Sequence, residues 1–288
     1  FGLNKFNFNK QISFNKVIFK VKIIMLLFQP KVYMFLIIAI VVIIKLVISP
    51  TLFDYIKSKL YYLPHKQMLS KPNMVDNVFL TNQNNEKQNG WYYDSNSSKV
   101  ILFCHGNAGN ISYRKHILNK CIEQNISILM FDYKGFGDSQ GETKIESTYD
   151  DAVDWMNYLI DVKNYTKNDI IPMGESIGSF PAAKLVAEQK LSKVIIIAGF
   201  HSISDVVNNL FPAPINYLAQ YITDGDLQTG KYLKKFTGDT LIFHSKSDET
   251  ISYQNAVMNS SYGGKLITIY GGHNDHNIDY KTIKEFIQ

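Results

Sequence analysis

From residue 73 onward the chain alternates between short apolar runs and longer stretches in which apolar positions recur every three or four residues. Short apolar runs are typical of buried strands, and the longer stretches are typical of amphipathic helices. Strands are predicted at Lys99–Cys104, Ile126–Phe131, Asp169–Met173, Lys193–Ala198, Thr240–His244 and Lys265–Tyr270. Helices are predicted at Ser112–Cys121, Lys144–Val162, Ile177–Gln189, Tyr253–Ser261 and His276–Ile287. This alternation predicts an α/β fold with a mostly parallel central sheet and helices on both faces.

Two regions depart from the alternation. Val75–Phe79 and Trp91–Tyr93 flank a polar turn, and they predict two edge strands. Phe200–Gly238 is rich in Phe, Tyr, Leu and Pro and lies between two predicted strands. We interpret residues of about 200–238 as a small cap that makes an apolar pocket over the site. The alternative is that these side chains make the ordinary core contacts of a packing helix.

The most apolar part of the chain precedes this pattern. Val32–Ser49 holds 18 residues of which only Lys45 is charged. At about 1.5 Å per residue it extends roughly 27 Å as a helix, enough to cross a bilayer core. We predict a transmembrane anchor at about 32–49 within an N-terminal segment of residues 1–50. A juxtamembrane stem at 51–72 and the α/β domain at 73–288 then follow. A signal peptide and a buried core helix are the alternatives.

The net charge of +5 is concentrated at the N-terminus, because residues 1–50 hold seven lysines and no acidic residue. The remaining residues sum to −2, so we expect no nucleic-acid partner. By the positive-inside rule, the lysines ahead of the apolar run predict a single-pass membrane protein whose α/β domain is lumenal or extracellular. If the chain starts at Met25, Lys31 stands almost alone on that side, and the bias weakens or reverses.

Nothing in the sequence predicts a cofactor or a metal. Cys104 and Cys121 form no CxxC motif and no cluster with histidine, which excludes a typical zinc site or disulfide framework. The stretch Tyr133–Gly141 spaces its glycines as G-x-G-x-x-x-G and leads into polar residues. A dinucleotide site requires G-x-G-x-x-G at the start of a helix, so we expect no nicotinamide cofactor.

Three residues that each follow a predicted strand stand in the order Ser, Asp, His. Ser176 is the centre of a G-x-S-x-G motif between a strand and a helix, and Asp248 and His273 follow two later strands. The carboxyl ends of parallel strands meet at one edge of a sheet, so the three side chains should converge there. We expect Ser176 to be the nucleophile, His273 its base and Asp248 the acid that orients the imidazole. The order is that of the α/β-hydrolases and predicts acyl transfer to water.

Each assignment has an alternative. Asp248 also fits the N-cap of the helix that follows, and Glu249 is then the second candidate for the acid. His276 is the weaker candidate for the base, since it lies at the start of the predicted final helix. His273 follows two glycines, which allow its loop to fold back over the sheet.

The loop His105–Asn110 follows the first long buried strand and consists mostly of small residues. Small residues let a backbone approach a scissile carbonyl group closely. We predict that the oxyanion hole takes one N–H from Asn107, with Ala108 as the next candidate, and the other from Ile177. The alternative is a Gly/Asn turn that leads into a helix.

Six motifs extend this pattern: Phe103–Asn110, Asp132–Ser139, Gly174–Gly178, Phe200–Asp205, Ser247–Glu249 and Gly271–Asp275. Together they resemble the membrane-anchored α/β-hydrolase-domain serine hydrolases, a group that includes lysophospholipases and protein depalmitoylases. The resemblance covers about residues 75–288 and implies the same triad and a single N-terminal anchor. Two residues depart from it. Ser179 stands where many members have a second glycine, and Glu175 where they often have a basic residue.

The sequence therefore predicts a membrane-anchored serine hydrolase that cleaves an ester or thioester in a lipid or an acylated protein. A serine peptidase of the same fold is the closest alternative, because it uses the same triad. A catalytically silent binding protein is the alternative from another class. The complete set of Ser176, Asp248 and His273 argues against it.

Overall fold

The computed structural model describes residues 50–213 and 215–288, and Thr51–Gln288 form one compact unit. Within these described residues, no helix is long and apolar enough to cross a membrane. The predicted anchor at 32–49 and the lysines ahead of it lie outside the described residues.

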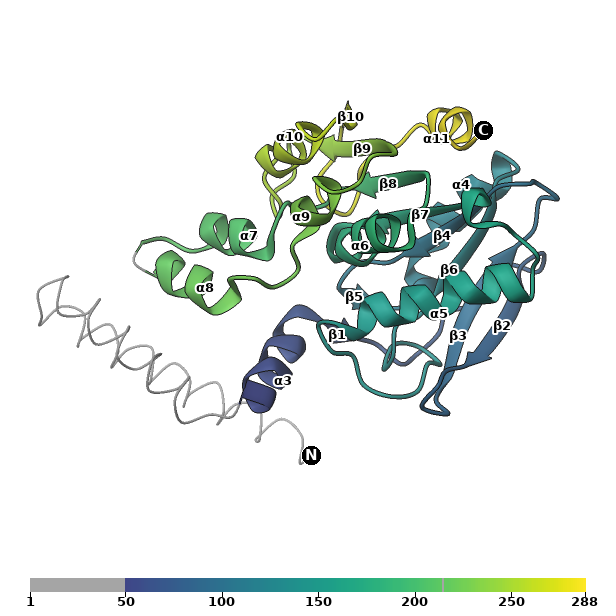
Figure 1. Ribbon diagram of the computed structural model, residues 1–288, viewed down its shortest axis with the longest axis horizontal. Coiled ribbons are helices and arrows are strands. Elements are labelled where there is room, and N and C mark those ends of the chain that lie inside the picture. Colours follow the sequence, from purple (N-terminus) through teal and green to yellow (C-terminus); the bar gives the residue numbers. More distant parts are fainter. Residues whose placement is uncertain (1–49, 214) are drawn as a thin grey trace, which may run out of the picture. The chain divides into compact units, whose positions relative to one another are not determined.

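The unit is built on an eight-stranded sheet with the strand order β10-β9-β8-β7-β4-β6-β3-β2 (Figure 1). The strands are β2 (Asp76–Thr81), β3 (Lys87–Tyr93), β4 (Val100–Cys104), β6 (Ser127–Phe131), β7 (Ile170–Glu175), β8 (Lys193–Ile197), β9 (Asp239–Ser245) and β10 (Lys265–Ile269). Strand β3 pairs antiparallel with β2 and β6, and the other pairs are parallel. The predicted mostly parallel sheet is confirmed. The prediction of Trp91–Tyr93 as an edge strand is wrong, because β3 has a neighbour on each side.

Helices cover both faces of the sheet (Figure 1). They include α4 (Lys115–Glu123), α5 (Ser147–Asp161), α6 (Ser179–Gln189), α10 (Gln254–Ser260) and α11 (Tyr280–Ile287). Trp155 of α5 and Ala182 of α6 belong to one apolar layer, and Leu118 of α4 and Ile283 of α11 belong to the other. Successive residues of β4 alternate between the two layers, as the period of a strand requires. The continuous apolar runs in the sequence reflect this burial on both faces.

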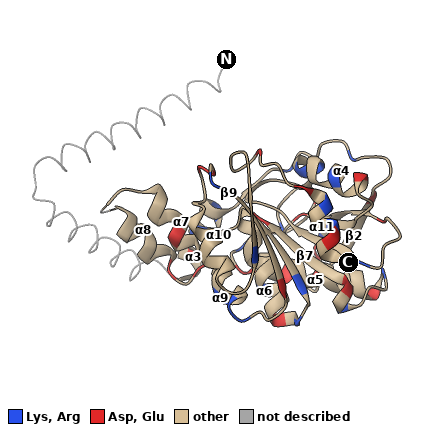
Figure 2. Cartoon of the chain, turned by 90° about the horizontal axis from the view of Figure 1, so that it is seen from above, with Lys and Arg blue, Asp and Glu red and all other residues tan. Residues whose placement is uncertain are grey.

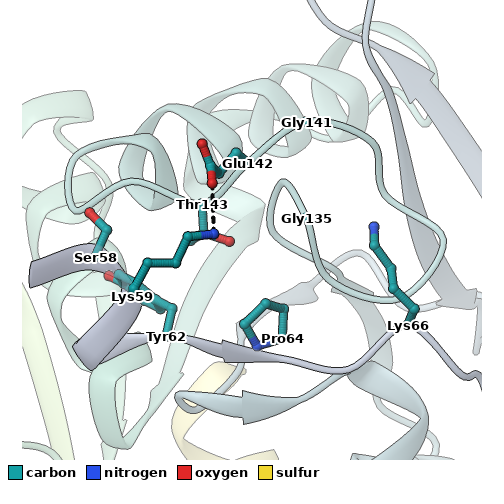
Figure 3. Close-up of a pocket in the computed structure, with 9 residues that line it drawn as sticks. All are labelled: Ser58, Lys59, Tyr62, Pro64, Lys66, Gly135, Gly141, Glu142 and Thr143. Carbon is teal, nitrogen blue, oxygen red and sulfur yellow. Dashed lines mark ion pairs between the residues drawn. The ribbon is translucent and has the colours of Figure 1, made fainter. Parts of the chain in front are cut away.

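Residues 51–66 are packed onto the rest of the compact unit. Helix α3 (Pro50–Tyr61) leads into β1 (Leu63–Pro64), which pairs parallel with β5 (Ala108–Gly109). Tyr62 is buried and meets two aromatic rings of the core edge-on. A cavity of about 230 Å³ lies between this segment and the loop around Gly141, and Lys59 and Glu142, which form an ion pair, both line it (Figure 3). The compact unit thus begins at Thr51, ahead of the boundary at residue 73 that the sequence predicts.

The insertion between β8 and β9 is helical, with α7 (Ile203–Leu210), α8 (Ile215–Thr223) and α9 (Thr229–Leu233). Leu227 and Leu233, at its end, join the core. Phe211, Ile215 and Tyr217, in the α7–α8 part, are exposed. The alternative of ordinary core contacts therefore holds near α9 and fails for most of α7–α8.

Tyr62→Ala should lower the free energy of unfolding by about 3 kcal/mol, because it empties a buried aromatic site. Tyr62→Phe should cost about 1 kcal/mol or less, since it only removes the hydroxyl contact with Thr148. Denaturant titration measures both changes. Met74→Ala, at a side chain that is 64% exposed, is the control and should have almost no effect. If residues 51–72 were a free stem, all three variants would behave alike.

Candidate active site

The G-x-S-x-G motif forms a tight turn at the end of β7. Ser176 has a φ of +53°, a left-handed conformation that is rare for a residue other than glycine. A single 3-10 turn, Ser176–Gly178, joins the strand to α6. A methyl group at Gly178 would overlap the carbonyl oxygen of Cys104, and one at Gly174 would overlap that of Gly178. Both flanking glycines are therefore required for this turn to press against the end of β4.

His273 lies in the loop after β10 and reaches Ser176. Its Nε2 atom is 3.0 Å from the Ser176 Oγ atom. The loop folds back at Gly271, whose φ of +102° favours glycine. The backbone N–H of His273 donates to the Glu249 carboxylate at 3.0 Å. His276, the second candidate for the base, instead donates from Nδ1 to the carbonyl oxygen of His273.

Asp248 follows β9 and completes the chain of contacts. Its Oδ2 atom is 2.8 Å from Nδ1 of His273, and its Oδ1 atom accepts from the backbone N–H groups of Thr250 and Ile251. Burial alone would raise the pKa of Asp248, but hydrogen bonds from His244, His273 and Ile251 outweigh it and hold the pKa well below its usual range. Asp248 thus makes contacts like those of a helix N-cap, which was the alternative interpretation, and it also contacts His273. Glu249 holds the loop and does not reach the ring of His273.

The loop after β4 lies against the same turn. A methyl group added at Gly106 would be 3.7 Å from Cβ of Ser176, so the backbone here passes close to the serine. The carbonyl oxygen of Asn107 accepts from the N–H of Leu63 at 2.8 Å, which holds the loop from the side of β1. Ile177 follows Ser176 directly and opens the turn into α6. The structure therefore brings both predicted oxyanion residues to the vicinity of Ser176.

Several known proteins are similar to this chain in sequence or in fold. The family model described as serine aminopeptidase, S33, matches residues 95–225. A solved alpha-beta hydrolase from Vibrio vulnificus has a TM-score of 0.70 at 20% identity, covering 83% of this chain and 93% of its own. The chain has the α/β-hydrolase fold. The esterase Pf2001 of Pyrococcus furiosus has a TM-score of 0.61 at 14% identity, covering 74% and 88%. Protein R595 of Acanthamoeba polyphaga mimivirus is 28% identical over 257 residues, 77% of this chain and 87% of its own.

Arg114 joins the loop 105–110 to the turn after β7, a role that the sequence did not predict. Its Nε atom is 3.1 Å from the carboxylate of Glu175, and its Nη1 atom donates to the carbonyl oxygen of Ala108 at 2.6 Å. Both side chains are largely buried. One guanidinium thus contacts the residue before Ser176 and the centre of the loop. Arg114 is the only arginine in the chain, and this was the one available signal.

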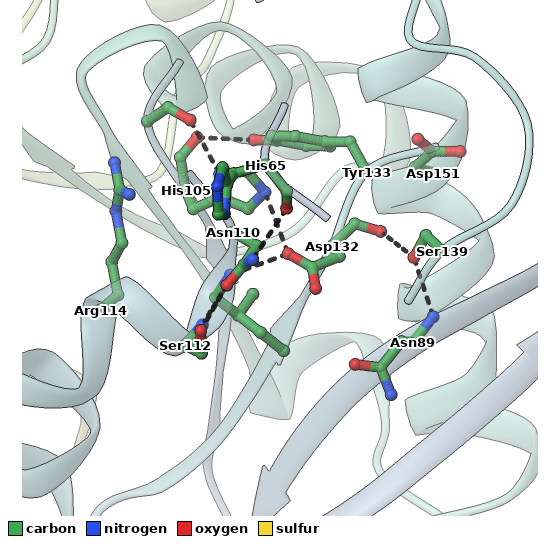
Figure 4. A network of polar contacts seen from close by, with 12 residues as sticks. His65, Asn89, His105, Asn110, Ser112, Arg114, Asp132, Tyr133, Ser139 and Asp151 are labelled. Carbon is green, nitrogen blue, oxygen red and sulfur yellow. Dashed lines mark hydrogen bonds and ion pairs between the residues drawn. The ribbon is translucent and has the colours of Figure 1, made fainter. Parts of the chain in front are cut away.

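A network of buried polar residues contacts the loop 105–110 and the residue after it (Figure 4). Oδ1 of Asp132 accepts from the N–H of Ile111 at 2.8 Å and lies 3.7 Å from Nε2 of His105. Tyr133 donates to the carbonyl oxygen of His105 at 3.0 Å. Burial raises the pKa of Asp132 to about 8, and burial with the Arg114 charge lowers the pKa of His105 to about 3. Both groups are therefore uncharged at neutral pH, which suits their complete burial.

His244 is a second residue near the site whose role the sequence did not predict; it is only the last residue of a predicted strand. It is fully buried, and its Nε2 atom lies 2.8 Å from the carbonyl oxygen of Ile251 and 3.3 Å from Oδ2 of Asp248. It therefore holds the Asp248 loop to the sheet. Among the described residues, no group of three or more His, Cys, Asp or Glu side chains has the geometry of a metal site. Cys104 and Cys121 are both buried and free.

Arg114→Lys should lower kcat on the order of 10- to 100-fold with little change in KM, because a lysine cannot hold Ala108 and Glu175 at once and the loop would shift. Steady-state kinetics on a soluble ester measures the split between kcat and KM. Glu175→Gln keeps an acceptor for the guanidinium and should lose less activity. Thermal unfolding must stay close to that of the parent. A change confined to KM or to stability would contradict the role of Arg114 in positioning the loop.

The free energy of unfolding of Asp132→Asn, compared with that of the parent at the same pH, should increase as the pH rises from 6 to 8. The folded pKa of Asp132 lies above its unfolded value, so the folded parent holds a proton that the unfolded chain has lost. The parent therefore loses up to about 1.4 kcal/mol of stability per pH unit in this window, and the variant does not. Denaturant titrations at pH 6, 7 and 8 test the difference. A constant difference between the two proteins would refute it.

Proposed function

We propose that this chain is a serine hydrolase that cleaves an ester or thioester through Ser176, His273 and Asp248. The observation that carries the proposal is the unbroken contact from Ser176 Oγ to His273 Nε2 at 3.0 Å and from His273 Nδ1 to Asp248 Oδ2 at 2.8 Å. The strained conformation of Ser176 supports it, because strain of this kind gathers at functional sites.

In the proposed reaction, Ser176 Oγ attacks the carbonyl carbon of the substrate while His273 Nε2 takes its proton. The ionised Asp248 stabilises the resulting imidazolium and keeps its Nδ1–H in place. Backbone N–H groups of Asn107 and Ile177 stabilise the oxyanion. His273 then protonates the departing alcohol or thiol, which leaves an acyl-enzyme. Water, deprotonated by the same histidine, attacks the acyl-enzyme and releases the acid and Ser176.

We place the substrate among lipids or acylated proteins. Support comes from the apolar α7–α8 insertion and from the predicted anchor at 32–49, which would keep the domain at a membrane. The proposed topology is a single pass with the domain lumenal or extracellular, following the lysines ahead of the apolar run. The fold neighbour Pf2001, which is called an esterase, is consistent with ester cleavage.

A peptidase is the second candidate, and one observation favours it. The matching family model is described as serine aminopeptidase, and its matched residues include the loop 105–110 and Ser176. That match ends at residue 225, so it contains neither Asp248 nor His273. Amide cleavage demands more of the general acid, because an amine leaves less readily than an alcohol. The two functions are separated by a substrate panel.

A fluorophosphonate probe should label the parent covalently, and Ser176→Ala should abolish the labelling, because the serine oxygen forms the new bond to phosphorus. His273→Ala should slow labelling by about 10⁴-fold, since the serine then lacks its base. Mass spectrometry of the labelled peptide identifies the site. Ser179→Ala, at a buried serine nearby, is the matched control and should still label.

Undiminished labelling of Ser176→Ala would refute the nucleophile, and absence of labelling in the parent would favour a silent binding protein. The unlabelled parent enzyme is then offered a long-chain ester, a palmitoyl thioester and an aminoacyl amide. Preference for the amide by kcat/KM would replace the proposed function with the peptidase.

A further inference from the structure

Helix α3 buries polar residues against the protein and exposes large apolar ones, among them Tyr55, Ile56 and Leu60, beside the charged side chains of Asp54 and Lys59. Lys57 and Ser58 are buried, and Lys57 pairs with Asp226 at 2.8 Å. Tyr55 and Leu60 lie on the other side of the helix and are 45% and 71% exposed. A surface helix of a globular protein normally shows the reverse arrangement. The outward face of α3 therefore suits an apolar environment.

The α7–α8 hairpin has the same character. From Ile203 to Thr223 the chain contains one charged residue, Asp205, and Figure 2 shows these helices almost free of charge. Among the described residues of α7 and α8, Val206 is the one apolar residue that is buried. Phe211, Ile215 and Tyr217 are 40–62% exposed. Exposed apolar side chains in this density mark an interaction surface.

The two elements form one surface. Asp226, just after α8, binds Lys57 through both carboxylate oxygens and accepts from the hydroxyl of Tyr61 at 2.9 Å. Lys57 keeps its proton in this setting, because the contacts with Asp226 and Asp54 raise its pKa despite burial. The views in Figures 1 and 2 both place α3 and α7–α8 at the same end of the domain.

We propose that the exposed apolar side chains of α3 and the α7–α8 hairpin dock on the surface of a lipid bilayer. The position of α3 in the chain favours a bilayer as the occupant, because α3 begins at Pro50, directly after the predicted anchor that ends at Ser49. A helix that follows a membrane-spanning run without a spacer lies at the level of the lipid headgroups. Tyrosine and leucine on the outward face suit that level.

Docking on this surface also orients the candidate active site. The α7–α8 hairpin follows β8, the neighbour of β7, on the carboxyl edge of the sheet where Ser176 lies. The bilayer would then meet the enzyme beside Ser176, and an acyl chain could reach the serine without crossing water. This consequence rests on the proposed catalytic function, whereas the docking itself rests on the predicted anchor at 32–49.

The docking is tested with the full chain reconstituted in phosphatidylcholine vesicles whose acyl chains carry bromine close to the headgroup. Leu60→Trp and Tyr217→Trp each add one indole to a protein whose Trp91 and Trp155 are buried. Bromine should quench the added fluorescence by about twofold or more at both positions. Val162→Trp is the control. Val162 is 57% exposed and precedes β7 at the amino edge of the sheet, so it should not be quenched.

Absence of quenching at both Leu60→Trp and Tyr217→Trp would overturn the docking. So would a blue-shifted, unquenched indole, which would mean that another part of the chain covers the surface. Equal quenching in Val162→Trp would mean that the bilayer contacts the amino edge of the sheet as much as the proposed surface, which would also overturn the docking.

A second arm uses Leu60→Glu and Tyr217→Glu, with Val162→Glu as the matched control. The two surface variants should cleave a long-chain ester in vesicles about tenfold more slowly and a short soluble ester at the rate of the parent. Equal rates in vesicles would remove the role of the surface in catalysis. If the parent cleaves neither ester, the proposed function fails, while the quenching result still decides the docking.

Discussion

The contact between Gly178 and the carbonyl end of β4 is the constraint on which the site depends. It presses the turn after β7 onto Cys104 and forces Ser176 into a left-handed conformation. Because β4 runs directly into the loop 105–110, the same contact sets the proposed nucleophile beside the proposed oxyanion loop. His273 and Asp248 come from the ends of other strands and reach a point that is already defined.

Charge around this point is controlled by partners and by burial. Asp248 stays ionised because two histidines and a backbone N–H surround it, whereas Asp132 holds its proton because burial dominates. The Arg114 charge is matched by Glu175, the residue that departs from the family pattern. This pair is a charge-assisted contact that links the turn after β7 to the loop 105–110. The residue that departs from the family pattern therefore helps to hold the loop.

The N-terminal part of the domain connects the site to the outer surface. Leu63 donates to the carbonyl oxygen of Asn107, and α3, just before it, is held by Asp226 of the insertion. A short segment thus contacts both the proposed oxyanion loop, through the pairing of β1 with β5, and the insertion between β8 and β9.

The sequence by itself determined the strands, most helices and the convergence of Ser176, Asp248 and His273. These follow from short-range signals and from one geometric rule, that parallel strands end at a common edge. Only the tertiary structure decided that Arg114 meets Glu175, that Asp132 meets His105, and that Tyr62 is buried. Each of these contacts joins residues far apart in the chain, and no local pattern encodes such a partner. The same holds for α3, because an amphipathic pattern shows that a helix has two faces and leaves open which of them turns inward.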